Sequence, residues 1–378
     1  MSKQRTKSKN KAAVVKVKSD IEKAVLDFLK KGMDNKIFDA VLIPMKVPAG
    51  DSFAYVLIKN KSLIKDASYL PPVMPVQGAN AVSSITRLGK GKMKIAAVMR
   101  PCETRATIEL TKLGQTDLEN IILISMDCPG VLPLSDFVKD PKKGIKLFDE
   151  SIQKGEDKSM RPVCQICDKS SMVSGDIHIG TLEAKKDTFF VISNSNKGDE
   201  ILSKLKISKK EDLDNWQSKV KNISEEKLKK RKNAHKTLKS KVGGLDNLLD
   251  TFSQCINCHN CMRVCPVCYC RLCYFDSDKV KHPSDDYLMR AEKTGSLRCP
   301  SDITLFQMGR MMHMSLSCVS CGMCEDACPM DIPVAQIFSM VADETQDLFD
   351  YVSGRDIEEP LPFVSYKEKE LEEMEDAA

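Results

Sequence analysis

The sequence predicts an α+β protein: an N-terminal α/β domain with a partly parallel sheet, followed by a mainly helical C-terminal domain. Three observations lead to this prediction. Residues 19–200 alternate strand and helix signals, residues 201–250 form a charged helical linker, and residues 251–354 combine helical patterns with two cysteine-rich repeats. The 378 residues suffice for two or three domains. We expect a basic disordered tail over residues 1–18 and an acidic tail over residues 355–378.

The N-terminal domain is expected to begin with a helix and two strands. A capping box formed by Ser19 and Glu22 precedes apolar residues at helical spacing, and Gly32 follows them, which predicts a helix over residues 20–31. Apolar runs at residues 40–43 and 53–58 are short enough to be strands. The run TFFVISN at residues 188–194 predicts a further strand.

The clearest unit is a strand-helix-strand crossover over residues 94–126. A strand KIAAVM leads through the turn RPC into a helix over residues 103–113, and the strand IILISM follows. Crossovers of this kind make parallel sheets, whose functional edge lies where the strands end. Cys102 and Cys128 follow the two strands, so both thiols are expected at one sheet edge. Either cysteine taken alone could equally be a small core residue.

A second thiol pair, Cys164 and Cys167, follows in RPVCQICD. A CxxC pair by itself is compatible with zinc, with a redox dithiol or with half of a cluster site. Together with Cys102 and Cys128 it gives four thiols, the number that one 4Fe-4S cluster takes. We therefore expect these four cysteines to form one site.

The number of cysteines and the N-terminus bear on cellular location. No apolar segment follows the charged start MSKQRTKSKNK, and no run has the composition of a membrane span. We therefore expect a cytoplasmic protein. In that reducing compartment, 16 cysteines favour metal ligation over disulfides.

The basic segments raise the question of nucleic-acid binding. The segment EEKLKKRKNAHKTLKSK has the composition of a charged helix. We interpret it as a solvated linker helix and expect no nucleic-acid partner.

Two repeats of one cysteine pattern dominate the C-terminal domain. Residues 255–266 read CINCHNCMRVCP, and residues 318–329 read CVSCGMCEDACP. In this ferredoxin run, three thiolates on a tight loop bind one 4Fe-4S cluster and the fourth cysteine ligates the other cluster. We therefore expect crossed ligation in a two-cluster ferredoxin-like domain. One cluster is assigned Cys255, Cys258, Cys261 and Cys328, and the other Cys318, Cys321, Cys324 and Cys265.

The segment between the repeats is expected to be helical. Leu305, Met308, Met312 and Leu316 recur at helical intervals, and we interpret this stripe as packing around the clusters. A further helix is expected after Pro333. Four cysteines remain, which could bind a further cluster, a zinc ion or no metal: Cys268, Cys270, Cys273 and Cys299. The chain would then hold two to four 4Fe-4S clusters.

Several of these segments carry a family resemblance. The runs KIAAVMRPCETRATIELTKL, NIILISMDCPG, RPVCQICDKSSMVSGDIHIG and CMRVCPVCYCRLCYFDS, with the segment from TLFQMGR to MDIPV, resemble the beta subunits of coenzyme F420-dependent formate dehydrogenases and hydrogenases. The resemblance covers about residues 36–354, and the cysteine-rich half is more similar to the formate dehydrogenase branch. It implies FAD, 4Fe-4S clusters and electron exchange between a catalytic partner protein and F420. It also implies that Cys102, Cys128, Cys164 and Cys167 ligate the cluster nearest the flavin.

One departure from the family concerns the flavin. Those beta subunits open with a glycine-rich stretch that lets the backbone approach the flavin phosphates. Here the segment VVKVKSDIEKAVLDFLKKG has no glycine before Gly32, and the carboxylates of Asp20 and Glu22 would repel a pyrophosphate at the start of the helix.

Two functions remain open at this point. The first is an iron-sulfur electron-transfer subunit of an anaerobic oxidoreductase complex. It would pass electrons between a partner of formate dehydrogenase, hydrogenase or heterodisulfide reductase type and a flavin with F420 or NAD(P). The alternative is a flavin-free relay between two partner proteins, without a substrate of its own. Both place the chain in a hetero-oligomer, and no residue pair stands out as a general acid and base.

Overall fold

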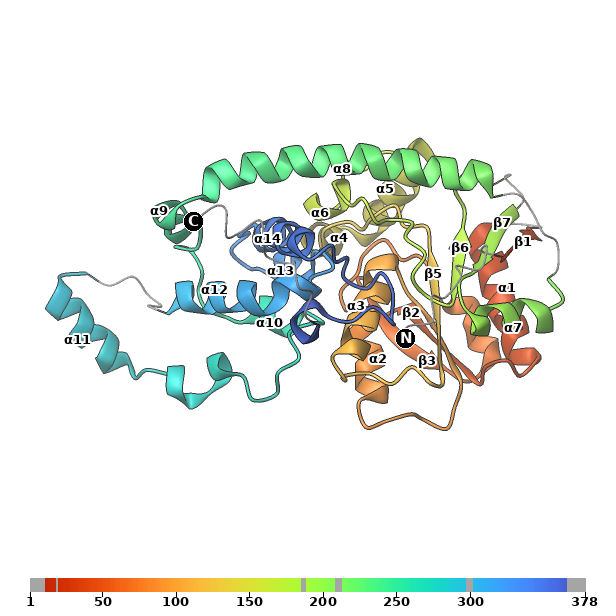
Figure 1. The fold of residues 1–378 in the computed structure, drawn as a ribbon, viewed down its shortest axis with the longest axis horizontal. Coiled ribbons are helices and arrows are strands. Elements are labelled where there is room, and N and C mark those ends of the chain that lie inside the picture. Colours follow the sequence, from red (N-terminus) through yellow and green to blue (C-terminus); the bar gives the residue numbers. More distant parts are fainter. Residues whose placement is uncertain (1–10, 18–19, 185–187, 208–212, 297–301, 366–378) are drawn as a thin grey trace.

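A seven-stranded mixed sheet forms the centre of the N-terminal half (Figure 1). The computed structural model describes residues 11–17, 20–184, 188–207, 213–296 and 302–365. The strand order is β1-β7-β6-β5-β4-β2-β3. Strands β2, β4, β5 and β6 run parallel, while β3, β7 and β1 pair antiparallel at the edges. The strands span Lys11–Lys16 (β1), Ala40–Lys46 (β2), Phe53–Ile58 (β3), Ile95–Val98 (β4), Ile121–Met126 (β5), Ile177–Gly180 (β6) and Thr188–Ser193 (β7).

Helices cover both faces of this sheet. Helices α1 (Ile21–Asp34) and α7 (Asn196–Lys204) pack on one face, and α2 (Gly78–Thr86) and α3 (Pro101–Lys112) on the other. Because side chains alternate along a strand, Ile122 and Ile124 of β5 enter the first layer and Ile121 and Leu123 the second. Burial on both sides explains why the parallel strands are continuously apolar. The predicted α/β domain with a partly parallel sheet is confirmed.

The beginning of the chain differs from the expected basic tail. Residues 11–16 form β1, which pairs with β7 along its whole length. Four apolar residues, AAVV, lie between the two lysines of this strand, and the sheet buries Ala12 and Ala13. Because lysines are frequent on both sides of these four residues, the segment has the composition of a charged tail although it forms a strand. Helix α1 is capped by Asp20, whose carboxylate accepts from the Lys23 N–H at 2.6 Å, whereas Ser19 lies outside the described residues.

Three short helices and a 3-10 turn complete the N-terminal half. Helices α4 (Leu134–Lys139) and α5 (Pro141–Lys154) pack with Phe53 and Val73 around the buried rings of Phe137 and Phe148. Helix α6 (Pro162–Gln165) follows, and η1 (Lys61–Asp66) contacts α1. These elements surround the loops that leave the carboxyl ends of the parallel strands.

The C-terminal half is helical, as predicted. Its helices are α9 (Leu245–Thr251), α10 (Asn260–Arg263), α11 (Ser284–Thr294), α12 (Ile303–Met314), α13 (Met323–Asp326) and α14 (Val334–Leu348). Its core forms around Phe252, Met262, Phe306, Ile337 and Phe338, against which several cysteines pack. In Figure 1, α11 lies at the end of an arm that projects away from this core.

The methionine stripe on α12 does not pack around the cysteines, so that interpretation was wrong. Leu305, Met308 and Met312 are 58%, 48% and 76% exposed. The buried face of α12 instead carries Phe306 and Arg310, with Ile303, Gln307 and Met314. An arginine and a glutamine on the inner face are unusual, because the inner face of an amphipathic helix is normally apolar.

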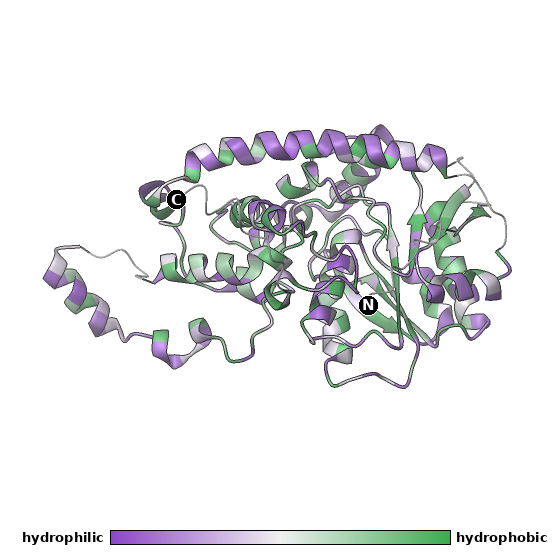
Figure 2. Ribbon diagram, in the orientation of Figure 1, coloured by the Kyte–Doolittle hydropathy of each residue, from purple (hydrophilic) through white to green (hydrophobic). Residues whose placement is uncertain are grey.

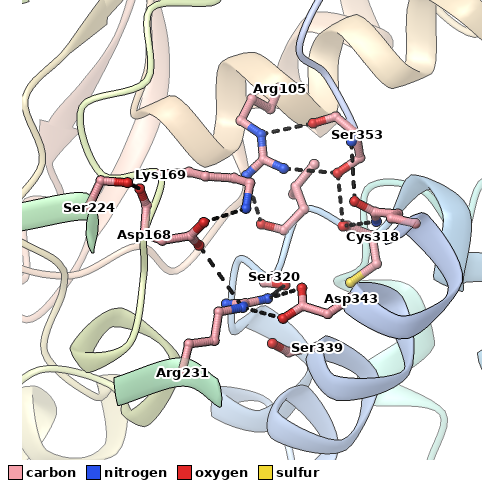
Figure 3. Close-up of polar contacts among 12 residues, drawn as sticks. Arg105, Asp168, Lys169, Ser224, Arg231, Cys318, Ser320, Ser339, Asp343 and Ser353 are labelled. Carbon is pink, nitrogen blue, oxygen red and sulfur yellow. Dashed lines mark hydrogen bonds and ion pairs between the residues drawn. The ribbon is translucent and has the colours of Figure 1, made fainter. Parts of the chain in front are cut away.

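The long helix α8 (Asp214–Val242) runs along one side of both halves (Figure 1). It is mostly hydrophilic (Figure 2), and no helix of the described residues is long and apolar enough to cross a membrane. Its residue Arg231, only 3% exposed, donates to both carboxylate oxygens of Asp343 on α14 at 2.6 and 2.7 Å and to the Ser320 hydroxyl at 2.9 Å (Figure 3). Its Nε also lies 4.0 Å from Asp168. The segment expected to be a linker therefore fastens the two halves together.

The Asp343 carboxylate should make the stability of the protein depend on pH in the acidic range. Burial alone would raise the pKa of Asp343, but hydrogen bonds from His235 and Arg231 and the Arg231 charge hold it well below its usual range. A depressed folded-state pKa stabilises the protein above the unfolded pKa of about 3.9, and this contribution is lost as the pH falls through the folded pKa. We expect Asp343→Asn to reduce the free energy of unfolding by about 2–3 kcal/mol at pH 7. The difference from wild type should narrow below pH ~4. Anaerobic denaturant titrations at several pH values measure this, and a difference that is constant with pH would contradict it.

Candidate iron-sulfur centres

Four cysteines lie near the edge of the sheet where the parallel strands end, and their role as ligands of one cluster stays a prediction. Cys102 lies in the first turn of α3 just beyond β4, and Cys128 follows β5. Cys164 is on α6 and Cys167 follows it. Burial raises the pKa of the Cys102 thiol, and the nearby Cys128 and Cys167 thiols raise it further. Burial likewise raises the pKa of Cys164 to about 12, with contributions from Cys128 and Cys167. We call these four residues the sheet-edge set.

A buried arginine faces this set. Arg100, 3% exposed, donates from Nη1 to the Cys128 sulfur at 3.1 Å and to the Gly130 carbonyl at 3.3 Å, and from Nη2 to the Pro71 carbonyl. The Glu103 carboxylate accepts from the Arg100 backbone N–H at 2.9 Å and from the Gly78 N–H at 2.7 Å. The Glu103 carboxylate therefore caps the beginning of α3, and the guanidinium of Arg100 donates to a cysteine sulfur.

The second repeat gathers around a cysteine from the first. Burial raises the pKa of Cys265, and the thiols of Cys321 and Cys318 raise it further. Burial also raises the pKa of Cys324, with contributions from Cys265, Cys321 and Cys318. Cys265 therefore lies near thiols of the second repeat, which is compatible with crossed ligation, and the assignment stays a prediction. We call Cys265, Cys318, Cys321 and Cys324 the second-repeat set.

The remaining cysteines of the two repeats line one small cavity. Cys255, Cys258, Cys261 and Cys328 lie on its wall together with Phe306 and Gln307. Burial raises the pKa of Cys261, and Cys255 and Cys258 raise it further while Arg310 lowers it. We call these four cysteines the first-repeat set.

Three of the last four cysteines lie in one segment. Burial raises the pKa of Cys268 to about 11, and Cys273 and Cys270 add to the effect. Cys270 is exposed, and the Cys273 sulfur contacts the Met262 sulfur at 3.9 Å. Cys299 lies outside the described residues. A cluster, a zinc ion or no metal at these positions therefore stays a prediction.

The donor chemistry of the three complete sets fits 4Fe-4S clusters. Each set offers four cysteine sulfurs, and at least one thiol of each set packs among apolar side chains. Among the described residues, no three Cys, His, Asp or Glu side chains converge tightly enough to share one metal ion. A cubane differs from such a site because its thiolates bind separate irons.

The start of α1 does not fit a flavin pyrophosphate. The Asp20 carboxylate occupies the first amides of the helix, and Glu22 accepts a hydrogen bond from the Ser68 hydroxyl at 2.8 Å. An anion at this helix end would meet two carboxylates instead of free N–H groups.

The second-repeat set shares neighbours with both of the other sets. Cys102 of the sheet-edge set and Cys321 of the second-repeat set pack in the same apolar clusters, with Ala79, Leu110 and Val319 in one and Met74, Val131 and Met323 in the other. Arg310 lies near thiols of both the second-repeat and first-repeat sets.

Polar contacts close the same boundary. Arg105 on α3 donates to the Ser353 carbonyl at 2.8 Å and hydroxyl at 2.9 Å (Figure 3). Arg161, beside α6, pairs with Asp326 of α13 at 2.6 Å.

The buried arginines could not be identified from the sequence. Arg310 lies 49 residues from Cys261, and Arg100 lies 28 residues from Cys128. No spacing rule links such pairs. The signal for Arg310 was an arginine within a methionine-rich helix, LFQMGRMMHM.

The chain is similar in sequence to two protein families and to several known proteins. Residues 251–332 match the 4Fe-4S dicluster domain family, and residues 137–219 match the family described as the C terminus of the coenzyme F420 hydrogenase/dehydrogenase beta subunit. The chain is 27% identical over 368 residues to the F420-dependent formate dehydrogenase subunit beta of Methanocaldococcus jannaschii, covering 88% of this chain and 92% of the relative. A chain of the F420-reducing [NiFe] hydrogenase complex from Methanosarcina barkeri aligns with 62% of this chain and 94% of its own length, with a TM-score of 0.44 and 11% identity.

A second curated relative is more similar in sequence. The F420-dependent formate dehydrogenase 1 subunit beta of Methanococcus maripaludis is 31% identical over 380 residues, covering 89% of this chain and 92% of that protein. This similarity extends over nearly the whole of both proteins. The resemblance seen in the sequence is thus confirmed. The chain is an iron-sulfur electron-transfer subunit and belongs to the F420-dependent formate dehydrogenase beta subunit family.

Proposed function

We propose that this chain carries electrons between a catalytic oxidoreductase subunit and a flavin with F420 or NAD(P), through clusters held by its three cysteine sets. The supporting observation is the shared packing of Cys102 and Cys321, which brings the sheet-edge and second-repeat sets together across the domain boundary. The curated relatives are named as subunits of F420-dependent formate dehydrogenases. A formate dehydrogenase type of partner is therefore the first choice.

The residues of the chain would bind the clusters, exclude water from them and adjust their reduction potentials. When bound, each 4Fe-4S cluster supplies a one-electron redox couple. Cys102 and Cys128, with Cys164 and Cys167, would hold one cluster at the sheet edge. The two repeat sets would hold one cluster each by crossed ligation. Apolar side chains such as Val131 and Met323 exclude water between the sets.

We place the electron acceptor at the sheet-edge set. A cavity of about 230 Å³ opens beside it, lined by Lys169, Ser170, Ser171 and, from α8, Ser224. The Ser170 carbonyl accepts from the Cys128 N–H at 3.0 Å, so one wall of this cavity is bonded to the sheet-edge set. Met172 and Val220 add apolar surface to the serine hydroxyls, a mixture that suits an acceptor with both apolar rings and hydrogen-bonding groups. We assign no general acid or general base among the described residues that line this cavity.

A flavin-free relay is the second candidate. It is favoured by the start of α1, where carboxylates occupy the position that a pyrophosphate would need. In that case the chain would pass electrons between two partner proteins, and the cavity beside Ser170 would face the second partner.

Iron and flavin analysis of the anaerobically purified, full-length chain separates these candidates. We expect ~12 iron for three clusters and ~16 if Cys268, Cys270, Cys273 and Cys299 hold a fourth. Near-stoichiometric flavin, with partner-dependent reduction of F420 or NAD(P), would support the first candidate. Full iron without flavin, with electrons still passing between partners, would support the relay. Iron near zero with zinc in its place would contradict both.

A further inference from the structure

Arg310 is a buried cation whose hydrogen-bonding groups face a cysteine. It lies on the inner side of α12 and is 2% exposed. Its Nη1 donates to the Cys261 sulfur at 3.0 Å and to Gln307 Oε1 at 3.2 Å, and its Nη2 donates to the Cys261 carbonyl at 3.0 Å. The guanidinium also lies 4.7 Å from the ring centre of Phe338 and 5.6 Å from that of Phe306.

No carboxylate balances this charge within the part of the chain that the structure describes: no Asp or Glu oxygen lies within 4.0 Å of an Arg310 nitrogen. Its Nε has no hydrogen-bond partner there either. Burying an unpaired guanidinium costs several kcal/mol. The polar partners of Arg310 are the sulfur and carbonyl of Cys261 and the amide oxygen of Gln307. The compensating negative charge therefore comes from the sulfur side.

Three other buried arginines near cysteines have carboxylates beside them. Arg161 pairs with Asp326, and Arg231 with Asp343. Arg100 donates to the Cys128 sulfur as Arg310 does to Cys261, but the Glu103 charge lies close to it. A fourth, Arg105, has no carboxylate beside it among the described residues but donates only to carbonyl and hydroxyl oxygens. Arg310 differs from all four because it donates to a cysteine sulfur without a described carboxylate beside it.

We infer that Arg310 is a positioning residue that raises the reduction potential of the cluster held by the first-repeat set. The inference rests on the proposed function, because it needs a cluster at that set. Reduction adds one electron, and hence one negative charge, beside a buried cation that has no other counter-ion. Net charge and hydrogen bonds to sulfur are the factors by which a protein adjusts the potential of such a cluster. Because the cysteine sulfur that accepts from its Nη1 is that of Cys261, this cluster is affected most.

Two substitutions remove this effect in different ways. Arg310→Gln deletes the charge. Gln307→Glu keeps the arginine but places a carboxylate at the atom that lies 3.2 Å from Nη1, which neutralises its charge. We expect each variant to lower the potential, so that the reduced-to-oxidised ratio at a fixed potential falls at least tenfold. This corresponds to about 59 mV for one electron.

Arg263→Gln is the matched control. Arg263 lies on α10, two residues from Cys261, but its side chain is 66% exposed and approaches Asp276 at 3.9 Å. Solvent screens such a charge, so the potential should not change. Arg310→Lys should shift the potential by less than Arg310→Gln, because it retains the charge but loses the two-point contact with Cys261.

Redox titration of the full-length chain, followed by EPR, measures these shifts. The signal of the first-repeat cluster is the one that Cys258→Ala abolishes. Equal potentials in wild type, Arg310→Gln and Gln307→Glu, with full iron content, would overturn the inference and leave the proposed function intact. If Arg310→Gln does not retain the cluster, Arg310→Lys decides: a potential below that of wild type supports the inference, and an unchanged potential overturns it. Gln307→Glu does not decide alone, because Gln307 Nε2 also donates to the Cys255 sulfur at 3.8 Å. A wild-type chain without any signal that Cys258→Ala removes would instead refute the cluster assignment itself.

Discussion

Replacing Cys265 by Ala is expected to perturb the same EPR signal as replacing Cys321, and to leave the signal that depends on Cys258 intact. The reason is geometric, since Cys265 belongs to the first repeat by sequence but lies beside Cys321 and Cys318 in the fold. Losing one of four thiolates should remove or convert one whole cluster, so the iron content should fall by up to ~4 per chain.

The comparison needs the three single variants purified anaerobically side by side. Cys258→Ala serves as the reference for the first-repeat set, and Cys321→Ala as the reference for the second-repeat set. If the spectrum of Cys265→Ala matched that of Cys258→Ala, each repeat would close its own cluster and the crossed assignment would be wrong.

The second large effect is expected at the ion pair between Arg161 and Asp326. Both side chains are almost completely buried, with 3% and 7% exposed. Asp326 also accepts from the Leu134 N–H at 3.0 Å, while Arg161 donates to the Met74 carbonyl at 2.9 Å. Asp326→Ala leaves the guanidinium buried without a counter-ion, so we expect a loss of about 3–5 kcal/mol in the free energy of unfolding.

The surface pair between Lys139 and Asp136 is the matched control. Its atoms are 2.8 Å apart, but the side chains are 75% and 65% exposed. Asp136→Ala should therefore leave the unfolding midpoint unchanged. Anaerobic denaturant titration of the cluster-loaded protein compares the two variants. An equal response of both would show that the buried pair does not hold the domains together.

The features that the sequence predicted are those set by local rules. Cys255 and Cys318 each begin a run with fixed spacing, because three thiolates on a tight loop must reach one cubane. This spacing can be read directly from the sequence. Cys102 and Cys128 could be placed at a common edge because a crossover makes neighbouring strands parallel. The strands β2, β3 and β5 were recognisable because burial on the sheet requires short apolar runs.

The features that were missed depend on contacts between distant segments. Arg310 faces Cys261 only because α12 packs over α10 with its polar side inward. The same packing leaves Met308 and Met312 exposed. The helical periodicity could be read from the sequence, but which face of the helix is buried could not. Residues 11–16 form a strand only because β7 offers a free edge nearly two hundred residues later. Periodicity and composition do not carry such information.

The packing of Cys102 against Cys321 has a consequence for the biogenesis of the protein. Both thiols lie in apolar clusters that form only when the two halves meet, and α8 and the Arg161–Asp326 pair then close the boundary over them. On the proposed function, closure of the boundary narrows the path by which iron and sulfide reach these thiols. The sheet-edge cysteines are also the first of the sixteen to leave the ribosome. Cluster insertion is then favoured before the two halves meet rather than afterwards.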